Sequence, residues 1–573
     1  MEHQVWDDLL QSMSTGGPKY PSGGSSTMLA KVLTRAVLAN GPVPRSEISK
    51  GSMLIRPKPL ASGTVGKAVE ALIGEQLLTA EEKKTGQPGP PITPLRLGDK
   101  WAIAGIHIDQ QHEGPDRLTG IVCGLDRRPI GPPITAEVPE HDRPHGAAAG
   151  RDLAGHVAKV AGELLAKLDC PRTFLGVGVG IGGHVHRGIV RDSVHTGWPP
   201  DVELQRLLNE ELRQLPQLRG APAVVENDAN ALAIHGFYDS SFTVLDVALI
   251  TVFRQGVGGA LILNGRLYRG FGGMAPEPGH IVVEYPEDQP GWSRPPTPSA
   301  AAALTFGDQC RCSTPGREHY GHLDTLATPA RIEGQLAALK RPGATGLEAI
   351  SLEAISLEQA AAAPLAIPVE GSQETLVFSP EAAVLRRAGR ALGRAVADLI
   401  NTLNPGELVL WLPRALAQPA PQSSGGEYLD AVEREVNGAC STGPADARRG
   451  NRHLTVRSYA DDEEAARDGA VAAATTVFNA FIEHARGRDA CPAARGPGSV
   501  VLPVATGNTT CHTGAAGRGR VRFHHSESAT AAATSRPPPA ANQAARSRCL
   551  RTIVKAAGSL ASARLSWLAS WAR

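Results

Sequence analysis

The stretch "VVENDANALAIHG", residues 224–236, places polar side chains directly behind a short apolar run. The apolar run is expected to end as a strand where a helix begins. A carboxylate at such a junction can remove a proton from a substrate as a general base, or it can simply hold the substrate. Asn and Asp at this place can also cap the helix N-terminus. The polar residues are Glu226, Asn227, Asp228 and Asn230.

The cysteine spacing indicates one place where a metal could bind. The chain has eight cysteines, of which only Cys310 and Cys312 are close together in the sequence. A chain of 573 residues does not need disulfides to fold. The pattern therefore fits a reducing compartment and a single metal site.

Length, charge and terminal sequence limit the classes of protein that remain. The 573 residues predict two or three domains, and a net charge of +1 restricts any DNA-binding surface to a local patch. The N-terminus "MEHQVWDDLLQ" lacks a basic segment followed by an apolar one. No apolar run reaches the roughly 20 residues needed to span a bilayer. We expect a cytoplasmic protein without a membrane partner.

The N-terminal hundred or so positions predict an arm followed by a small DNA-binding domain. Residues 1–27 are expected to form a flexible arm, because their second half is rich in Gly, Pro and Ser. Residues 28–97 predict three helices and then a turn that returns to a strand, which is typical of a winged helix-turn-helix but also fits other small helical bundles. The polar face expected to meet DNA comprises Ser62, Thr64 and Lys67.

From residue 98 to residue 487, strands alternate with helices, which indicates α/β layers. Asn264-Gly265 between two apolar runs predicts a hairpin. Long helices are expected from Glu381 to Leu403 and from Glu463 to Ala485. The tandem duplication "LEAISLEAISLE", residues 347–358, is expected to be an inserted surface helix.

Residues 488–573 are rich in Ala, Arg, Pro and Ser and have little periodic apolar content, so we expect a disordered basic tail. The tail either contacts nucleic acid or a membrane surface, or is an inherited extension without a role.

Five stretches of the chain resemble the ROK family, which comprises repressors, open reading frames and kinases. They occur in family order within residues 28–485. The resemblance implies two α/β lobes of the actin-like, ribonuclease-H-like kind that close on a sugar. A winged helix ahead of this core resembles the repressor branch, and the Ala/Gly/Arg-rich texture is similar to actinobacterial members. The stretches are "VVENDANALA", "GVGGALILNGRLYRG", "GGMAPEPGHIVVE", "CRC" with "GHLD", and "ALGRAVADLINTLNP".

The resemblance implies a sugar site. Asn227 and Asp228 match the family's sugar-contacting pair, and in kinase members this Asp is the general base. Glu277 and His280 match two further sugar contacts. Asp324 stands where family members commonly have a sugar-binding Glu. Carboxylates and an amide suit this role because they accept from and donate to neighbouring hydroxyls.

The resemblance also implies a structural zinc site. His280, Cys310 and Cys312 match three family ligands, but the third family cysteine is missing. Imidazole can replace a thiolate on zinc. We expect His322 as the fourth ligand, with His319 as the reserve; the alternative is a vestigial loop with two free thiols.

Against the family pattern, the elements that hold ATP in kinases are altered. The first phosphate motif resembles D-I-G-G-T in the family, whereas "GIHIDQQH" has His107 in place of the Asp and Asp109 in place of the first Gly. The new carboxylate and the bulky side chains after it, Gln110 and Gln111, oppose a polyphosphate by charge and by size. No ATP is therefore expected.

The other two ATP elements depart from the family as well. The second phosphate turn, residues 254–258, keeps its last glycines and lacks its Thr. The adenosine-side strand ends in Trp411-Leu412 instead of a Gly-Gly pair. We therefore expect Asp228 to hold a sugar without acting as a base.

Three functions remain open. The first is a DNA-binding repressor, a homodimer or dimer of dimers, that responds to a small sugar or amino-sugar and binds a palindromic operator. The second is an ATP-dependent hexose kinase with an added regulatory head. The third is a degenerate relative that binds neither ligand well. The N-terminal domain and the altered phosphate motif favour the first.

Overall fold

The computed structural model describes the chain in segments. Among the described helices, none combines the length and the apolar character that crossing a bilayer requires. Of the tail expected over residues 488–573, only Arg488 is described. The described residues are 3–15, 25–39, 41–50, 60–82, 93–110, 114–142, 150–169, 171–192, 198–218, 220–239, 242, 244–284, 310, 312, 319–339, 355–368, 376–439 and 453–488.

Helix α1 (Gln4–Thr15) occupies part of the segment predicted to be a flexible arm, so that prediction is wrong for these residues. The helix buries Trp6, Leu9, Leu10 and Met13, which have the spacing of one helical face. The indole Nε1 of Trp6 donates a hydrogen bond to the backbone oxygen of Leu175, at 2.7 Å. The helix is therefore held by tertiary contacts that the local sequence does not reveal.

The described part of the N-terminal head, residues 25–97, has three helices and a three-stranded antiparallel sheet of order β1-β3-β2. This agrees with the three helices predicted for the segment. The last of them exposes Ser62, Thr64 and Lys67. Residues 51–59 and 83–92 lie outside the described residues, so the expected connections in these two segments are not tested. The elements are α2 (Ser26–Leu38), β1 (Val43–Pro44), α3 (Arg45–Lys50), α4 (Ser62–Gly74), β2 (Leu78–Ala80) and β3 (Pro94–Leu97).

The first lobe contains a five-stranded mixed sheet. Its strands are β4 (Trp101–Asp109), β5 (Asp116–Gly124), β6 (Ile134–Val138), β7 (Thr173–Ile181) and β10 (Ala223–Asn227). The strand order is β10-β7-β4-β5-β6. Strands β10, β7 and β4 are parallel to one another, whereas β5 pairs antiparallel with β4 and β6 pairs antiparallel with β5. The apolar face of the sheet packs against α5 (Arg151–Ala166) and α6 (Leu204–Leu212), and a small hairpin, β8 (His184–His186) and β9 (Ile189–Asp192), follows β7.

The second lobe repeats this pattern. Its strands are β11 (Val247–Val252), β12 (Val257–Leu263), β13 (Arg266–Tyr268), β16 (Glu407–Pro413) and β17 (His453–Tyr459), in the order β13-β12-β11-β16-β17. Strands β11, β16 and β17 are parallel. Asn264 and Gly265 form the β12–β13 turn with φ values of 54° and 69°, so the predicted hairpin is confirmed. The α/β class is confirmed in both lobes.

Helices cover the outer face of the second sheet. The long helix α12 (Pro380–Leu403) begins and ends within one residue of its prediction. Residues 340–354, which hold most of the tandem duplication, lie outside the described residues. The remaining elements are α9 (Asp324–Ala327), α10 (Pro329–Leu339), α11 (Leu357–Ala362), β14 (Ala366–Pro368), β15 (Leu376–Phe378), α13 (Arg414–Ala417) and α14 (Gly426–Ala439).

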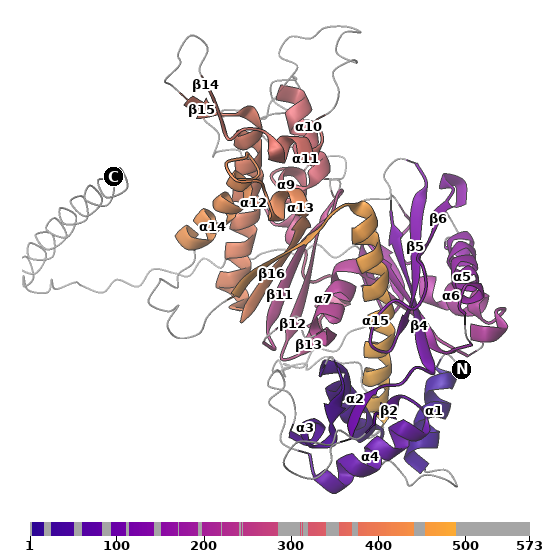
Figure 1. Cartoon of the computed structure of the whole chain (residues 1–573). Helices are drawn as coiled ribbons and strands as arrows, with labels where there is room; N and C mark the ends of the chain where they lie inside the picture. Colours follow the sequence, from indigo (N-terminus) through magenta and orange to yellow (C-terminus); the bar gives the residue numbers. More distant parts are fainter. Residues whose placement is uncertain are drawn as a thin grey trace, which may run out of the picture. The chain divides into compact units, whose positions relative to one another are not determined.

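Two helices, α7 (Asp228–Tyr238) and α15 (Asp462–Arg488), lie between the two sheets (Figure 1). Glycines on the sheet let α15 approach closely: a Cβ on Gly178 would fall 1.8 Å from the backbone oxygen of Ala473, and one on Gly105 would fall 1.9 Å from that of Ala470. The alternating glycines of "FLGVGVGIG" are therefore a packing surface for a helix.

The far end of α15 belongs to the same apolar cluster as the head. Phe478 and Phe481 of α15 pack in one cluster with Trp6 of α1 and Leu29 of α2. Helix α15 therefore runs from the space between the lobes to the N-terminal head.

Candidate functional site

A cleft lies where the two lobes meet. The carboxyl ends of the parallel strands β4, β7 and β10 form one wall, and the β11–β12 turn and the start of α15 form the other. Ligands of open α/β sheets bind at such strand ends. The polar residues around the cleft include Asp109, Asn227, Asp228, Glu277, His280 and Asp462.

Asn227 and Asp228 stand at the junction of β10 and α7, as the sequence predicts. Asn227 caps the helix: its Oδ1 accepts from the backbone N–H of Asn230, and its Nδ2 donates to the backbone oxygen of Gly183, both at 3.0 Å. The Oδ1 of Asp228 accepts from the N–H of Ala229 at 2.7 Å. Burial, with the charge of Glu277 adding to it, raises the pKa of Asp228 to about 6. Capping and lining the cleft are thus compatible roles for this pair.

Glu226 has a structural role. It is 5% exposed, and its Oε2 pairs with Arg269 Nη2 at 2.5 Å. Its Oε1 accepts from Asn230 Nδ2 at 3.0 Å. The carboxylate therefore ties helix α7 to the segment after β13, and it does not belong to the cleft lining.

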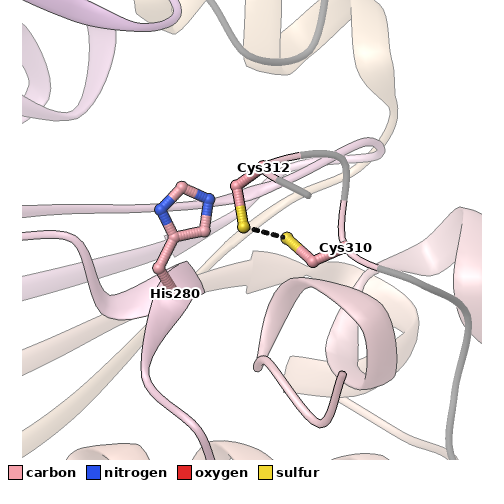
Figure 2. Close-up of side chains that lie close together, drawn as sticks. All are labelled: His280, Cys310 and Cys312. Carbon is pink, nitrogen blue, oxygen red and sulfur yellow. Dashed lines mark hydrogen bonds between the residues drawn. The ribbon is translucent and has the colours of Figure 1, made fainter. Parts of the chain in front are cut away.

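Cysteine and histidine side chains converge on Cys312. Its Sγ lies 3.1 Å from Cys310 Sγ, 3.2 Å from His319 Nδ1 and 3.5 Å from His322 Nδ1. Two overlapping triads share Cys312, and His280 completes the first of them together with Cys310 (Figure 2). Both histidines that the sequence offered as ligands lie beside this thiol. Thiolates and imidazoles at these separations can hold a metal ion.

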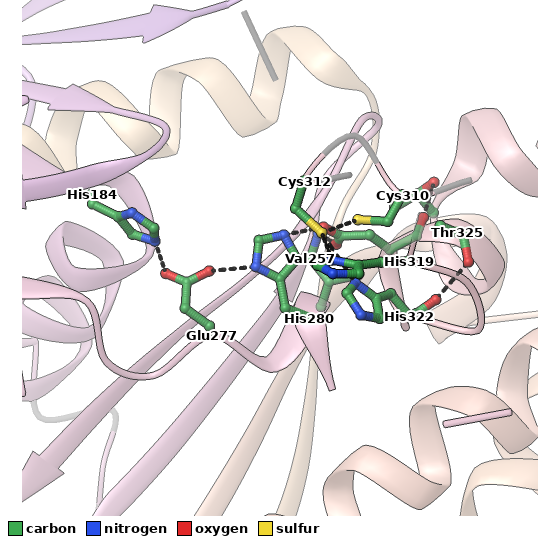
Figure 3. Close-up of polar contacts among 11 residues, drawn as sticks. His184, Val257, Glu277, His280, Cys310, Cys312, His319, His322 and Thr325 are labelled. Atoms are coloured by element: carbon green, nitrogen blue, oxygen red, sulfur yellow. Dashed lines mark hydrogen bonds and ion pairs between the residues drawn. The ribbon is translucent and has the colours of Figure 1, made fainter. Parts of the chain in front are cut away.

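Glu277 is flanked by two histidines (Figure 3). Its Oε1 lies 2.6 Å from His184 Nε2, and its Oε2 lies 3.6 Å from His280 Nδ1. The hydrogen bond to Glu277 raises the pKa of His184. His184 is a cleft residue that the sequence analysis missed. The available signal was its place just beyond the carboxyl end of β7, where polar side chains face a ligand.

Asp324 does not line the described part of the cleft. It is 7% exposed; its Oδ1 accepts from the backbone N–H of Val257 at 2.6 Å, and its Oδ2 lies 3.7 Å from His280 Nε2. An Asp side chain is one methylene shorter than the Glu of the family pattern. The geometry gives Asp324 a positioning role behind His280 and Val257, so its sugar contact remains a prediction.

The part of the cleft around the altered phosphate motif, at the end of β4, is acidic. Asp109 ends β4, and Asp462 begins α15. Burial raises the pKa of Asp109 to about 6, and the charges of Asp462 and Asp228 act in the same direction. Nearby, Trp411 packs against Tyr459 and Phe253, with ring centroids 5.0 and 5.6 Å apart. A polyphosphate in this place would meet carboxylates.

Comparison with known proteins relates the chain to regulators and to kinases. Residues 156–411 match the ROK family. A glucokinase of Halalkalibacterium halodurans is 27% identical over 285 residues, which are 48% of this chain and 71% of that protein. A xylose repressor of Bacillus spizizenii is 23% identical over 261 residues, 44% of this chain and 60% of the repressor. The match to the repressor therefore spans less than two thirds of its length.

Among solved structures, a ROK family transcriptional regulator described as a homolog of the Escherichia coli Mlc protein superposes with a TM-score of 0.55. It is 21% identical in sequence, and the match covers 81% of this chain and 99% of that one. This likeness shows a shared fold. Because a glucokinase and a xylose repressor are both similar to this chain in sequence, the choice between the two functions depends on the site.

Proposed function

We propose, because this chain contains a ROK family domain, that it is a sugar-responsive DNA-binding repressor of carbohydrate metabolism without kinase activity. The main observation that supports this proposal is the position of helix α15. It begins at the cleft with Asp462 and Ala466 and ends among apolar residues shared with the head. A ligand that moves the lobes would therefore also move the head, which is what an effector-controlled repressor requires.

The described part of the head supports the DNA-binding half of the proposal. Helix α4 presents exposed Ser62, Thr64 and Lys67 from its N-terminal half, and its N-cap residue, Ala61, has no side chain that can cap it. The first backbone N–H groups of α4 are therefore available for phosphate oxygens. We infer that α4 is the recognition helix and that a dimer places two such helices on a palindromic operator.

Replacing Lys67 with alanine should weaken operator binding and reduce the slope of log affinity against log salt by about 1, as expected for one lost phosphate contact. Binding to promoter DNA near the gene is measured over a range of salt concentrations. Lys159→Ala, a change of the same kind on the exposed side of α5, is the matched control. Wild-type protein that ignores such DNA at low salt would overturn the repressor proposal.

The cleft supports the sugar-binding half of the proposal. Asp228, Glu277 and His280 offer charged acceptors and ring nitrogens to vicinal hydroxyls. Asn227 and His184 hold the surrounding loop and Glu277 in place. A relative that binds neither sugar nor DNA well is the third alternative, and the DNA and sugar titrations described here separate it from a repressor.

A sugar kinase is the second candidate function. Its support is Asp228, whose raised pKa of about 6 suits a general base near neutral pH, and the kinase relatives. Asp109 and Asp462 argue against a kinase, because they bring negative charge to the place where a kinase needs backbone N–H groups to bind phosphate. ATP-dependent phosphorylation of hexoses at the order of 1 per second would establish the kinase instead.

We further propose that the Cys/His cluster holds a structural zinc ion. Cys310 and Cys312 offer thiolates, His319 and His322 lie beside Cys312, and His280 Nε2 is buried without a hydrogen-bond partner among the described residues. The donor set suits tetrahedral zinc. The ion would fix His280, which also lines the cleft, and the segment that carries Asp324.

Native protein should contain one zinc ion per chain, and Cys312→Ser should lose it because Cys312 belongs to both triads. Removing zinc should also weaken effector binding, since His280 faces both sites. Elemental analysis after gentle purification measures the content. Cys123→Ala, which removes a buried thiol outside the cluster, should keep zinc. Substoichiometric zinc in native wild-type protein would contradict the site.

A further inference from the structure

The charge of the cleft distinguishes between classes of effector. Asp109, Asp228 and Asp462 line its inner part, and Glu277 lines the sugar side. Arg254 is the single Lys or Arg among the cleft residues that the structure describes, and its Nη2 pairs with Glu333 at 3.0 Å. The cleft therefore favours a cation over an anion.

The carboxylates face a common space. Asp109 and His107 are two residues apart on β4 and therefore share one face of the strand. A Cβ on Gly182 would lie 2.9 Å from Gln110 Oε1 and 3.7 Å from Asp228 Oδ2. The absence of a side chain at Gly182 thus leaves room between the end of β4 and Asp228.

Buried polar groups indicate that this space is built for a polar ligand. His107, His184 and Asn230 line the cleft and are 7%, 8% and 3% exposed. Within the described part of the chain, one polar atom of each lacks a hydrogen-bond partner: His184 Nδ1, Asn230 Oδ1, and His107 Nδ1, which lies against Gly469 of α15. Buried polar groups without a partner are uncommon in folded proteins, and a bound polar ligand is one explanation for them.

We propose that the effector is a sugar with a free amino group, whose hydroxyls meet Asp228 and Glu277 and whose ammonium group lies between Asp109 and Asp462. This inference rests on the proposed function and names the ligand class of its cleft. Charged hydrogen bonds from an ammonium group to carboxylates are stronger than neutral ones. A sugar phosphate would instead bring further negative charge beside buried carboxylates, so we expect phosphorylated sugars to bind more weakly.

Burial supports the same assignment. It raises the pKa of both Asp109 and Asp228 to about 6, although the charge of Arg117 acts on Asp109 in the opposite direction, so ionising both carboxyls without a further cation is unfavourable. A bound ammonium group relieves this repulsion. The carboxylate that replaces a glycine of the family's phosphate motif then has a function of its own, namely recognition of a positive charge.

The test is direct calorimetric titration of the full-length protein, without DNA, at neutral pH. The probes are 2-amino-2-deoxyhexoses of gluco, manno and galacto configuration, each with its N-acetylated, 2-hydroxyl and 6-phosphate counterpart. One free amino sugar should bind about tenfold or more tightly than its N-acetylated form, and its 6-phosphate should bind more weakly still. Tighter binding of an N-acetylated or phosphorylated sugar would overturn the inference, as would no binding of any probe.

Two variants locate the ammonium group. Asp109→Asn and Asp462→Asn should each lower the preference for the amine over the N-acetylated sugar by about tenfold. Asp152→Asn, the same change on the exposed start of α5, should keep that preference. An unchanged preference in both cleft variants, with melting temperatures near wild type, would overturn the placement. Because the titration contains no DNA, its result does not depend on the repressor proposal. A protein that selects the amino sugar but does not bind promoter DNA would contradict the repressor proposal and leave the inference about the ligand in place.

Discussion

Replacing Trp6 with alanine is expected to lower the free energy of unfolding by about 3–5 kcal/mol, the usual cost of removing a large aromatic side chain from a core. Trp6 is 1% exposed and stacks on His3 at a centroid distance of 4.7 Å. Its Nε1 donates to the backbone oxygen of Leu175 at 2.7 Å. Denaturant unfolding followed by intrinsic fluorescence and circular dichroism measures the loss.

A conservative variant separates packing from hydrogen bonding. Trp6→Phe retains a ring against Phe481 and loses the N–H donor, so it should cost less than the alanine variant. A loss of less than about 1 kcal/mol for Trp6→Ala would show that α1 does not dock as described. Helix α1 contacts three parts of the molecule: the first lobe at Leu175, α15 through the pair Asp7–His484, and the end of α4 through the pair Ser12–Glu75. Release of α1 should therefore also weaken the response of operator binding to sugar.

The elements that sequence predicted well are specified by local chemistry. Ser379 caps α12 by accepting from the N–H of Ala382, and Asn404 ends that helix in the left-handed region. Asn264 and Gly265 supply the positive φ values of their turn. Caps, turns and helical periodicity act over a few residues and can therefore be recognised without knowing the tertiary structure.

Helix α1 could not be predicted in the same way. Its apolar spacing is present in "QVWDDLLQSM", but the partner that stabilises Trp6 is 169 residues away. A short amphipathic segment ahead of a Gly/Pro-rich stretch is equally compatible with an arm until that partner is known. Long-range packing therefore determines that this segment forms a docked helix instead of an arm.

In the candidate site, too, some features follow from the local sequence and others depend on tertiary contacts. The sequence placed Asn227 and Asp228 at a strand–helix junction, and the structure puts both on the cleft. His184 was missed because its contact with Glu277 joins residues that are 93 positions apart. Asp324 was expected to touch a sugar, and the backbone N–H of Val257, the first residue of β12, donates a hydrogen bond to its carboxylate. Residue type can suggest a role, but which partner a carboxylate meets is set by tertiary geometry.

The Asp228→Asn variant should bind the effector more weakly by about 1.5–3 kcal/mol, or roughly ten- to a hundredfold. The change keeps the size of the side chain and removes a charged acceptor from a sugar hydroxyl. If Asp228 were instead a catalytic base, the same variant would abolish turnover and leave sugar binding largely intact. The exposed Asp152→Asn variant controls for the loss of one charge.

The effect on pH dependence follows from the raised pKa. Burial holds the pKa of Asp228 near 6 in the free cleft, so the ionised acceptor is present above that pH and is lost as the pH falls through it. Effector affinity of the wild type should therefore decline below about pH 6, by at most about tenfold per pH unit for each carboxylate that must be ionised. Asp109 titrates in the same range, so Asp228→Asn should make the decline shallower without removing it.

Linkage extends the prediction to DNA. A sugar can shift operator affinity only through its different affinities for the two conformations of the protein. Asp228 lies at the cleft, and the contacts that couple the cleft to the head run through α15. The variant should therefore need more sugar to release the operator, in proportion to its lost affinity. Operator release is titrated against sugar for both proteins. Superimposable release curves would show that Asp228 does not touch the effector, and its assignment as a sugar ligand would then be wrong.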